Sequence, residues 1–217
     1  MIRGAIFDLD GTVLDSMSVW ATAASDYLKS IGVCPPGDVD NAVCTMSLEE
    51  TAVYLIDRCK LELSAAAVMA QINRQIERKY FFEVQPKPGI AAVLDGLARR
   101  GVKLCMATAT DLYQVRAALE RCALSDYFPA VFTCTQAGAG KESPAVFEMA
   151  RAYLNLPAQQ IAVFEDAPHA AQTAKRAGFY VIGIFDRFSA DRQEALRASC
   201  DLYLESWTDS RVYERFG

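Results

Sequence analysis

The sequence lacks several features that would assign it to common functional classes. Its 217 residues include a single histidine, and 22 basic residues face 27 acidic ones, giving a net charge of -5. That balance argues against a nucleic-acid-binding protein, which needs a basic surface. No apolar run is long enough to cross a bilayer, and the run at the amino terminus is too short for a signal peptide. We therefore expect a cytoplasmic protein with neither nucleic-acid nor membrane partners.

Two frequent cysteine and glycine motifs are also missing. The seven cysteines form no C-x-x-C pair, which excludes a zinc ribbon, and their odd number does not suggest a disulfide framework. Seven such thiols suit a reducing cytosol. The stretch GAGKES is not a phosphate-binding P-loop, because Glu142 stands where that motif needs serine or threonine after the lysine.

What the chain does contain is a regular alternation of strand-like and helix-like segments. Apolar runs typical of strands are followed by segments with apolar residues at helical spacing, and glycines often end those helices. The predicted strands are 2–7, 102–107, 131–133, 161–164, 180–184 and 202–204. This alternation predicts an α/β fold, with a Rossmann-like, doubly wound parallel sheet covered on both faces.

Residues 16–82 do not follow this pattern. They contain no good strand run, but they do contain apolar stripes at helical spacing around Trp20–Ile31, Val53–Cys59 and Val68–Ile76. The sequence Ser47-Leu-Glu-Glu50 fits a capping box that opens the second of these helices. We therefore predict a helical domain at 16–82, inserted into a core domain that comprises 1–15 and 83–217.

Polar side chains follow the predicted strands where ligands bind in parallel α/β sheets, beyond the carboxyl ends of the strands. The residues are Asp8, Asp10, Thr108, Thr110, Lys141, Glu165 and Asp166. Hard oxygen ligands of this kind suit Mg²⁺, which commonly takes one or two carboxylates together with substrate phosphate. A carboxylate nucleophile with a second carboxylate as acid and base fits phosphoryl transfer through an aspartyl-phosphate.

Four motifs in this order resemble those of the haloacid dehalogenase superfamily: DLDGTVLDS, MATAT, GKESPAVF and FEDAPHAAQTAKRAG. The resemblance covers nearly the whole chain and is to the branch that includes β-phosphoglucomutase and phosphoglycolate phosphatase. It implies that residues 16–82 are a helical cap domain on a haloacid dehalogenase-like core. It also implies a phosphoric monoester hydrolase, because the second acid of the D-x-D motif, Asp10, is present.

The resemblance assigns a role to each matched residue. It implies that Asp8 is the nucleophile and that Asp10 is the general acid/base. Thr108, Ala109 and Lys141 would bind the phosphoryl group that is transferred. The family usually has proline after this lysine, whereas this chain has Glu142.

The resemblance also implies a Mg²⁺ cofactor. Its ligands would be Asp8, Asp10, Glu165 and Asp166, with Asp10 contributing its main-chain carbonyl and Glu165 bound either directly or through a second sphere. For two further polar residues a structural role is the simpler interpretation. We expect Thr110 to serve structure or minor binding, and Asp15 to hydrogen-bond near the start of the insert.

The sequence leaves three functions open. We expect a Mg²⁺-dependent phosphatase of small phosphorylated metabolites, acting as a monomer. The first alternative is a β-phosphoglucomutase-like phosphosugar mutase, but those mutases carry a histidine and a cap arginine where this chain has Trp20 and Leu48. The second alternative, of another class, is a non-catalytic protein that binds a phosphorylated ligand, since a fold alone does not guarantee activity.

Overall fold

The computed structural model describes residues 1–44, 46 and 48–217. These residues form two compact units. The first, called here the sheet unit, comprises Met1–Asp15 and Val84–Gly217, and the second, the helical unit, comprises Ser16–Glu83. The division lies one residue away from the predicted boundary between 82 and 83.

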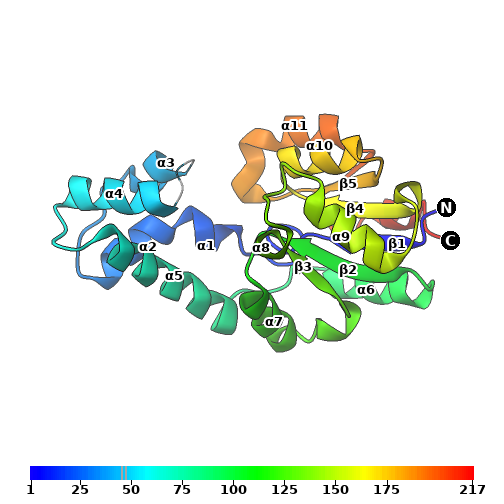
Figure 1. The fold of residues 1–217 in the computed structure, drawn as a ribbon, viewed down its shortest axis with the longest axis horizontal. Coiled ribbons are helices and arrows are strands. Elements are labelled where there is room, and N and C mark those ends of the chain that lie inside the picture. Colours follow the sequence, from blue (N-terminus) through cyan, green and yellow to red (C-terminus); the bar gives the residue numbers. More distant parts are fainter. Residues whose placement is uncertain (45, 47) are drawn as a thin grey trace. The chain divides into compact units, whose positions relative to one another are not determined.

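The sheet unit contains six parallel strands in the order β3-β2-β1-β4-β5-β6, drawn as arrows in Figure 1. The strands are β1 (Gly4–Phe7), β2 (Lys103–Thr108), β3 (Val131–Thr133), β4 (Ile161–Glu165), β5 (Tyr180–Ile184) and β6 (Leu202–Leu204). The predicted α/β fold with a parallel sheet is confirmed. The chain builds outward from β1 to β3, then crosses to β4 on the other side of β1. In sheets of this kind, ligands usually bind beyond the carboxyl ends of the strands at such a reversal, which here lies between β1 and β4.

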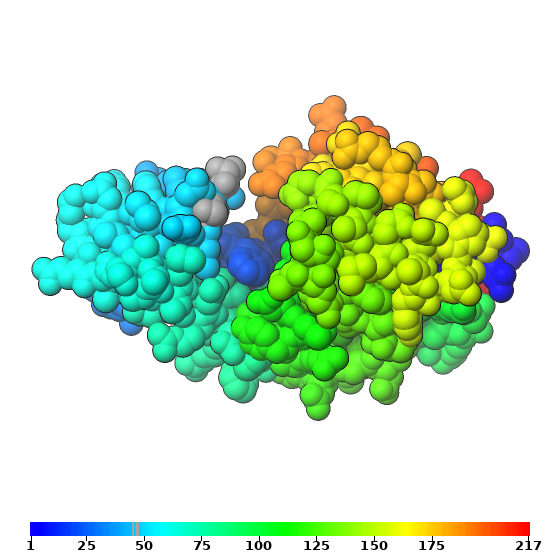
Figure 2. Space-filling view, in the orientation of Figure 1, coloured from blue at the N-terminus to red at the C-terminus, as the bar shows by residue number. Residues whose placement is uncertain are grey.

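The helices of the sheet unit alternate with its strands. They are α6 (Ile90–Arg99), α7 (Leu112–Arg121), α8 (Cys134–Ala137), α9 (Ala145–Leu154), α10 (Pro168–Arg176) and α11 (Gln193–Ser199). One face of the sheet packs against α9, α10 and α11 through a buried cluster that includes Ile6, Val163, Phe147, Ala171 and Leu196. In the space-filling view, the yellow-green to orange residues of these helices form much of the visible surface of the sheet unit (Figure 2).

The other face of the sheet carries an aromatic cluster. Phe7 of β1 and Phe164 of β4 are register partners, and their rings stack with centroids 4.3 Å apart. Side chains alternate between faces along a strand, so Phe7 and Phe164 point away from the cluster that contains Ile6 and Val163. Phe128, Trp207 and Phe216 pack around these two rings. The residues directly after Phe7 and Phe164 in the chain are Asp8 and Glu165, so this cluster underlies the strand ends that bear the acids.

The described residues of the helical unit form α1 (Met17–Ala21), α2 (Ala23–Ser30), α3 (Val39–Val43), α4 (Leu48–Cys59) and α5 (Ala65–Phe82). Its own core includes Tyr27, Leu55, Ile72 and Tyr80, each at most 1 % exposed. Ser47 of the predicted capping box lies outside the described residues. Among the described residues, no helix has both the length and the apolar character that crossing a membrane requires.

Candidate functional site

A buried lysine connects two of the strand-end acids. Lys141 lies in the turn after α8, which the Ser143 N–H closes by donating to the Gly140 carbonyl (3.1 Å). Its Nζ donates to Oδ1 of Asp8, at the end of β1, and to Oε1 of Glu165, at the end of β4 (2.5 Å). All three side chains are buried. The structure therefore brings together residues from three distant sequence positions at the carboxyl edge of the sheet.

Glu142 is compatible with this turn. It is exposed and follows Lys141 at the third position of the turn, and its carboxylate lies close to Gly140. Lys141 still reaches Asp8. Replacement of the family's proline by glutamate does not displace the lysine.

Three buried carboxyl groups share one lysine, and the pKa values of Asp8 and Asp166 are raised as a result. Burial is the largest cause that raises the pKa of Asp8 to about 8; the charge of Lys141 opposes it, while those of Glu165 and Asp10 add to it. Burial and then the charges of Asp8 and Glu165 raise the pKa of Asp166 well above its usual value. Burial alone would lower the pKa of Lys141, but the carboxylates beside it outweigh burial and raise that pKa.

The donor set fits a hard divalent cation. Carboxylate oxygens of Asp8, Glu165 and Asp166 lie within 4.8 Å of one another, and all three residues are buried. Oxygen ligands at this spacing suit Mg²⁺. Buried carboxylates are costly unless a cation or hydrogen bonds compensate them, and Lys141 supplies only one positive charge. The cluster therefore has both the atoms and the uncompensated charge that a Mg²⁺ site needs.

The remaining predicted residues lie at the ends of β1 and β2. Thr110 Oγ1 donates to Oδ2 of Asp10 (2.5 Å), and the Thr110 N–H donates to Thr108 Oγ1 (3.1 Å). Thr108 is fully buried, whereas Ala109, between the two threonines, is exposed. Thr110, for which a structural role was expected, thus connects Asp10 with Thr108.

The loop after β1 reaches the acids of β4. Thr12 Oγ1 donates to Oδ1 of Asp166 across 3.5 Å, a long contact. Gly11 has a φ of +74°, a backbone conformation that side chains disfavour, and its N–H donates to the Leu14 carbonyl (3.0 Å). The D-x-D-G-T sequence therefore serves this turn as well as the chemistry of its acids.

Sequence reasoning missed three residues that surround this loop. Asp186, 1 % exposed, follows β5 and pairs with Lys87 (2.9 Å), while Trp207 donates from Nε1 to the Thr12 carbonyl (3.0 Å). Asp186 had a usable signal, because it is a further acid at a strand end. Lys87 and Trp207 had none, since nothing in their local sequence marks them.

Two residues set aside at the sequence level lie apart from this cluster. Asp15 forms a partly exposed ion pair with Arg187 (3.4 Å). His169 is exposed in α10. In the part of the chain that the structure describes, neither side chain is hydrogen-bonded or ion-paired to an acid of the cluster.

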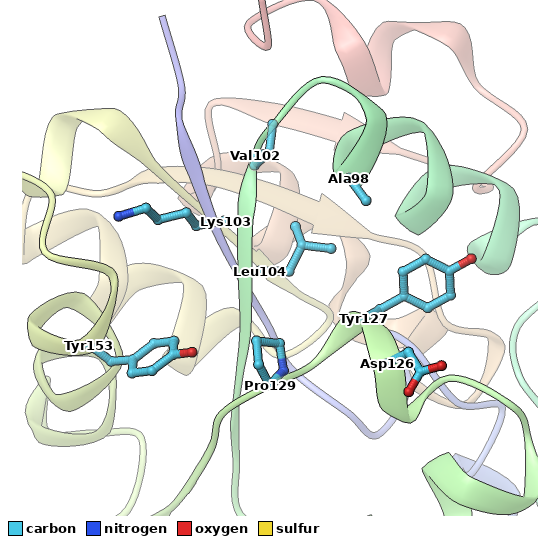
Figure 3. A pocket seen from close by; sticks show the side chains of 8 residues that line it. All are labelled: Ala98, Val102, Lys103, Leu104, Asp126, Tyr127, Pro129 and Tyr153. Carbon is cyan, nitrogen blue, oxygen red and sulfur yellow. The ribbon is translucent and has the colours of Figure 1, made fainter.

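A sizeable pocket in the sheet unit lies elsewhere. It has a volume of about 530 Å³ and is lined by Ala98, Val102, Lys103, Leu104, Asp126, Tyr127, Pro129 and Tyr153 (Figure 3). Residues 102–104 are at the start of β2, whereas Thr108 is at its end. The pocket is therefore at the opposite end of that strand from the acids, and it is not part of the candidate site.

Comparison with known proteins identifies similar sequences along most of the chain. The sequence profile of the family described as haloacid dehalogenase-like hydrolase matches residues 5–184. A phosphorylated carbohydrates phosphatase from Thermotoga maritima is 23 % identical over 82 % of both chains. The β-phosphoglucomutase of Bacillus subtilis is 25 % identical, over 98 % of this chain and 99 % of its own.

Solved structures share the fold. A β-phosphoglucomutase-like protein from Thermotoga maritima has a TM-score of 0.86 at 21 % identity, over 98 % of this chain and 97 % of that one. CbbY from Rhodobacter sphaeroides, solved with phosphate, has a TM-score of 0.76 at 21 % identity over 96 % of both chains. The expected resemblance is confirmed, and the chain belongs to the haloacid dehalogenase-like hydrolase family.

Proposed function

We propose that the protein is a Mg²⁺-dependent phosphatase of small phosphorylated metabolites that works through an aspartyl-phosphate on Asp8. One observation carries the proposal: Asp8 is in a buried cluster with Lys141, Glu165 and Asp166 at the carboxyl edge of the sheet. A buried carboxylate next to a cation and further metal-type ligands suits nucleophilic attack on phosphorus, because positive charge can stabilise the oxygens on which negative charge develops. The hydrolase family and the phosphatase name of the Thermotoga relative support the same reaction.

In the first half-reaction, a carboxylate oxygen of Asp8 attacks the phosphorus, and the bond from phosphorus to the ester oxygen breaks. Asp10 donates a proton to the departing oxygen, so an alcohol leaves. Asp10 accepts a hydrogen bond from Thr110, which orients its carboxyl group for this transfer. Because Asp10 is now ionised, it can next take a proton from water, which attacks phosphorus and releases Asp8 and inorganic phosphate.

The other residues stabilise charge on the phosphoryl group. Lys141 already bonds to Asp8, so its ammonium group lies next to the atom that attacks. Thr108 and exposed Ala109 are at the strand end beside it and are assigned to the phosphoryl oxygens. Asp8, Glu165 and Asp166, with the carbonyl of Asp10, would hold Mg²⁺. When bound, Mg²⁺ supplies the positive charge that keeps Asp8 ionised and neutralises phosphoryl oxygens.

A second candidate is a β-phosphoglucomutase-like isomerase. The Bacillus mutase, which matches this chain along nearly its whole length, favours it. A mutase must return the phosphoryl group of its aspartyl-phosphate to a sugar, whereas a phosphatase gives it to water. Trp20 and Leu48 stand where the mutases are expected to carry histidine and arginine, and we therefore place hydrolysis first.

The test is phosphate release from a panel of sugar phosphates, glycolate phosphate and nucleoside monophosphates, with Mg²⁺ and with EDTA. Wild type is compared with Asp8→Asn, which keeps the size of the side chain but removes the nucleophile. β-Glucose 1-phosphate is also assayed for glucose 6-phosphate. We expect Mg²⁺-dependent phosphate release by wild type and a loss of at least about 1,000-fold in the variant, because covalent catalysis needs the carboxylate.

The alternatives give different results. Glucose 6-phosphate without phosphate release would assign the protein to the mutases. Equal phosphate release by wild type and Asp8→Asn would exclude Asp8 as the nucleophile. Binding of phosphate esters with no turnover of any of them would support a non-catalytic binding protein.

A further inference from the structure

Trp207 packs against the two strands, β1 and β4, that end at acids of the candidate site. It follows β6 near the end of the chain and is 3 % exposed. Its ring centroid is 6.0 Å from that of Phe7 and 5.4 Å from that of Phe164. These two residues immediately precede Asp8 and Glu165 in the chain. One buried indole thus packs beneath the ends of both strands that deliver the acids.

The indole N–H adds a directional contact. Trp207 Nε1 donates to the main-chain carbonyl of Thr12, 3.0 Å away and 195 positions earlier in the sequence. Thr12 lies in the loop that carries Asp10, and its hydroxyl donates to Asp166. The side chain of Trp207 therefore contacts the strand that precedes Asp8, the strand that ends at Glu165, and the loop after β1. This loop carries Asp10 and, through Thr12, bonds to Asp166.

Among the described residues, no main-chain N–H of the loop donates to this carbonyl. Its internal hydrogen bonds use the carbonyls of Leu9 and Leu14 as acceptors. The next carbonyl, that of Val13, accepts from the N–H of Lys87 (2.9 Å), a residue whose side chain pairs with Asp186. Two segments far away in the sequence thus donate to adjacent carbonyls of the loop. Lys87 donates from its main chain to Val13, and Trp207 donates from its side chain to Thr12.

We propose that Trp207 is a positioning residue, which fixes the loop of Asp10 and Thr12 against Asp166 and so sets the geometry of the cation site and of proton transfer. This inference rests on the proposed function for its effect on catalysis, whereas its effect on the cation site stands without it. Residues that orient metal ligands from outside the first sphere commonly change metal affinity or activity by about 10- to 100-fold.

The two tryptophans of the chain provide a matched test. Trp207→Phe keeps an aromatic ring next to Phe7 and Phe164 but removes the N–H. Trp20→Phe, in the helical unit, removes an indole hydrogen bond as well, which Trp20 Nε1 donates to Tyr80 Oη at the same distance of 3.0 Å. Three quantities are measured for wild type and both variants: Tm, the Kd for Mg²⁺ by titration calorimetry, and kcat and KM on the best ester.

We expect Trp207→Phe to raise the Kd for Mg²⁺ by about 10-fold and to lower kcat by a similar factor, with KM changed less than about threefold. Trp20→Phe should leave the Kd for Mg²⁺ within about twofold of wild type, because its bond to Tyr80 lies within the helical unit, which contains no proposed Mg²⁺ ligand. If Trp207→Phe lowers Tm but leaves Kd and kcat at wild-type values, the residue has a structural role only and the proposal is overturned.

The result also separates this proposal from the proposed function. If wild type releases no phosphate from any ester, the proposed function fails, and the Kd comparison still decides the role of Trp207. If Trp207→Phe does not fold, the indole N–H resonances of wild type provide the answer, with Trp20→Phe assigning them. On addition of Mg²⁺, the Trp207 resonance should shift and that of Trp20 should not; an unchanged Trp207 resonance would overturn the proposal.

Discussion

Among single residues, Asp8 has the ionisation with the clearest consequence for stability. Burial, with the charges of Glu165 and Asp10, raises its pKa from 3.8 to about 8, although Lys141 opposes the shift. In the unfolded chain Asp8 loses its proton near pH 4. Between these two values the folded protein holds a proton that the unfolded chain has lost. The stability of the metal-free protein should therefore fall as pH rises from about 4 to about 8.

The variant Asp8→Asn removes this dependence, because an amide does not ionise. In EDTA, we expect its Tm relative to wild type to rise between pH 5 and pH 8 by about 3 °C or more, since 1 kcal/mol corresponds to about 2–4 °C in a chain of this size. Differential scanning fluorimetry at four pH values measures the change. Asp201→Asn, at a partly exposed carboxylate paired with Lys175, is the control and should show no such trend. A constant difference between Asp8→Asn and wild type would contradict the prediction.

The sequence allowed prediction of site residues whose position follows from a strand. Asp8, Thr108, Glu165 and Asp166 each lie within two residues of the end of a predicted strand, and Lys141 follows the short strand β3. Parallel strands bring such positions to one edge, so their proximity follows from topology. Trp207 could not be found this way, because its contact with Thr12 depends on how the last segment of the chain packs. The same is true of Lys87, whose partner Asp186 is about 100 residues away.

At the scale of elements, the two glycines that flank α6 differ in how much space a side chain would have. Both have a positive φ, but only Gly89 lies close to another segment of the chain. Gly89 (φ +90°) precedes the helix and Gly101 (φ +71°) follows it. A Cβ on Gly89 would lie 3.2 Å from Cβ of Trp207, whereas a Cβ on Gly101 would meet nothing within 4 Å. Alanine at either position adopts a left-handed conformation that costs about 1–2 kcal/mol.

Gly89→Ala should therefore reduce the free energy of unfolding more than Gly101→Ala does. We expect a loss of about 1 kcal/mol for Gly101→Ala and at least about 1 kcal/mol more for Gly89→Ala, because crowding of a packed core adds to the backbone strain. Urea denaturation of both variants measures the difference. Equal losses would mean that the Trp207 segment moves aside at no cost, and that it is held less firmly than its contacts indicate.

The elements of the sheet unit were easier to predict than those of the helical unit. Buried parallel strands produce continuous apolar runs, which stand out in a sequence. In the helical unit, the single apolar stripe predicted from Trp20 to Ile31 is divided by Thr22 between α1 and α2. Thr22 Oγ1 donates to the Ser18 carbonyl and bonds with Asp26, contacts that compete with a continuous helix. The five-residue helix α3 was missed because it is too short to show a period.

At the scale of the whole molecule, the two units differ in what they contain. Every residue assigned here to the phosphoryl group or to Mg²⁺ belongs to the sheet unit, as do Trp207 and Lys87. The helical unit has a core of its own, which includes Tyr27 and Tyr80. We therefore propose that the sheet unit performs the chemistry and that the helical unit selects the substrate.

The ends of the helical insertion allow this division to be tested. The Asp15 N–H donates to the Gln85 carbonyl (2.9 Å), and Leu14 forms an antiparallel bridge with Pro86. The chain thus leaves and re-enters the sheet unit at adjacent points. A Gly-Ser linker of about four residues can therefore join Asp15 to Val84 in place of residues 16–83.

We expect the shortened chain to fold cooperatively and to bind Mg²⁺ with a Kd within about threefold of that of the full chain, because every proposed ligand belongs to the sheet unit. It should hydrolyse different phosphate esters at similar rates, whereas the full chain should discriminate among them. Circular dichroism, calorimetry and the ester panel measure these three properties, and Asp166→Asn in the shortened chain is the control that should lose Mg²⁺ binding. A folded chain that binds no Mg²⁺ would show that the helical unit contributes to the cation site. Retained discrimination among esters would instead place substrate selection in the sheet unit.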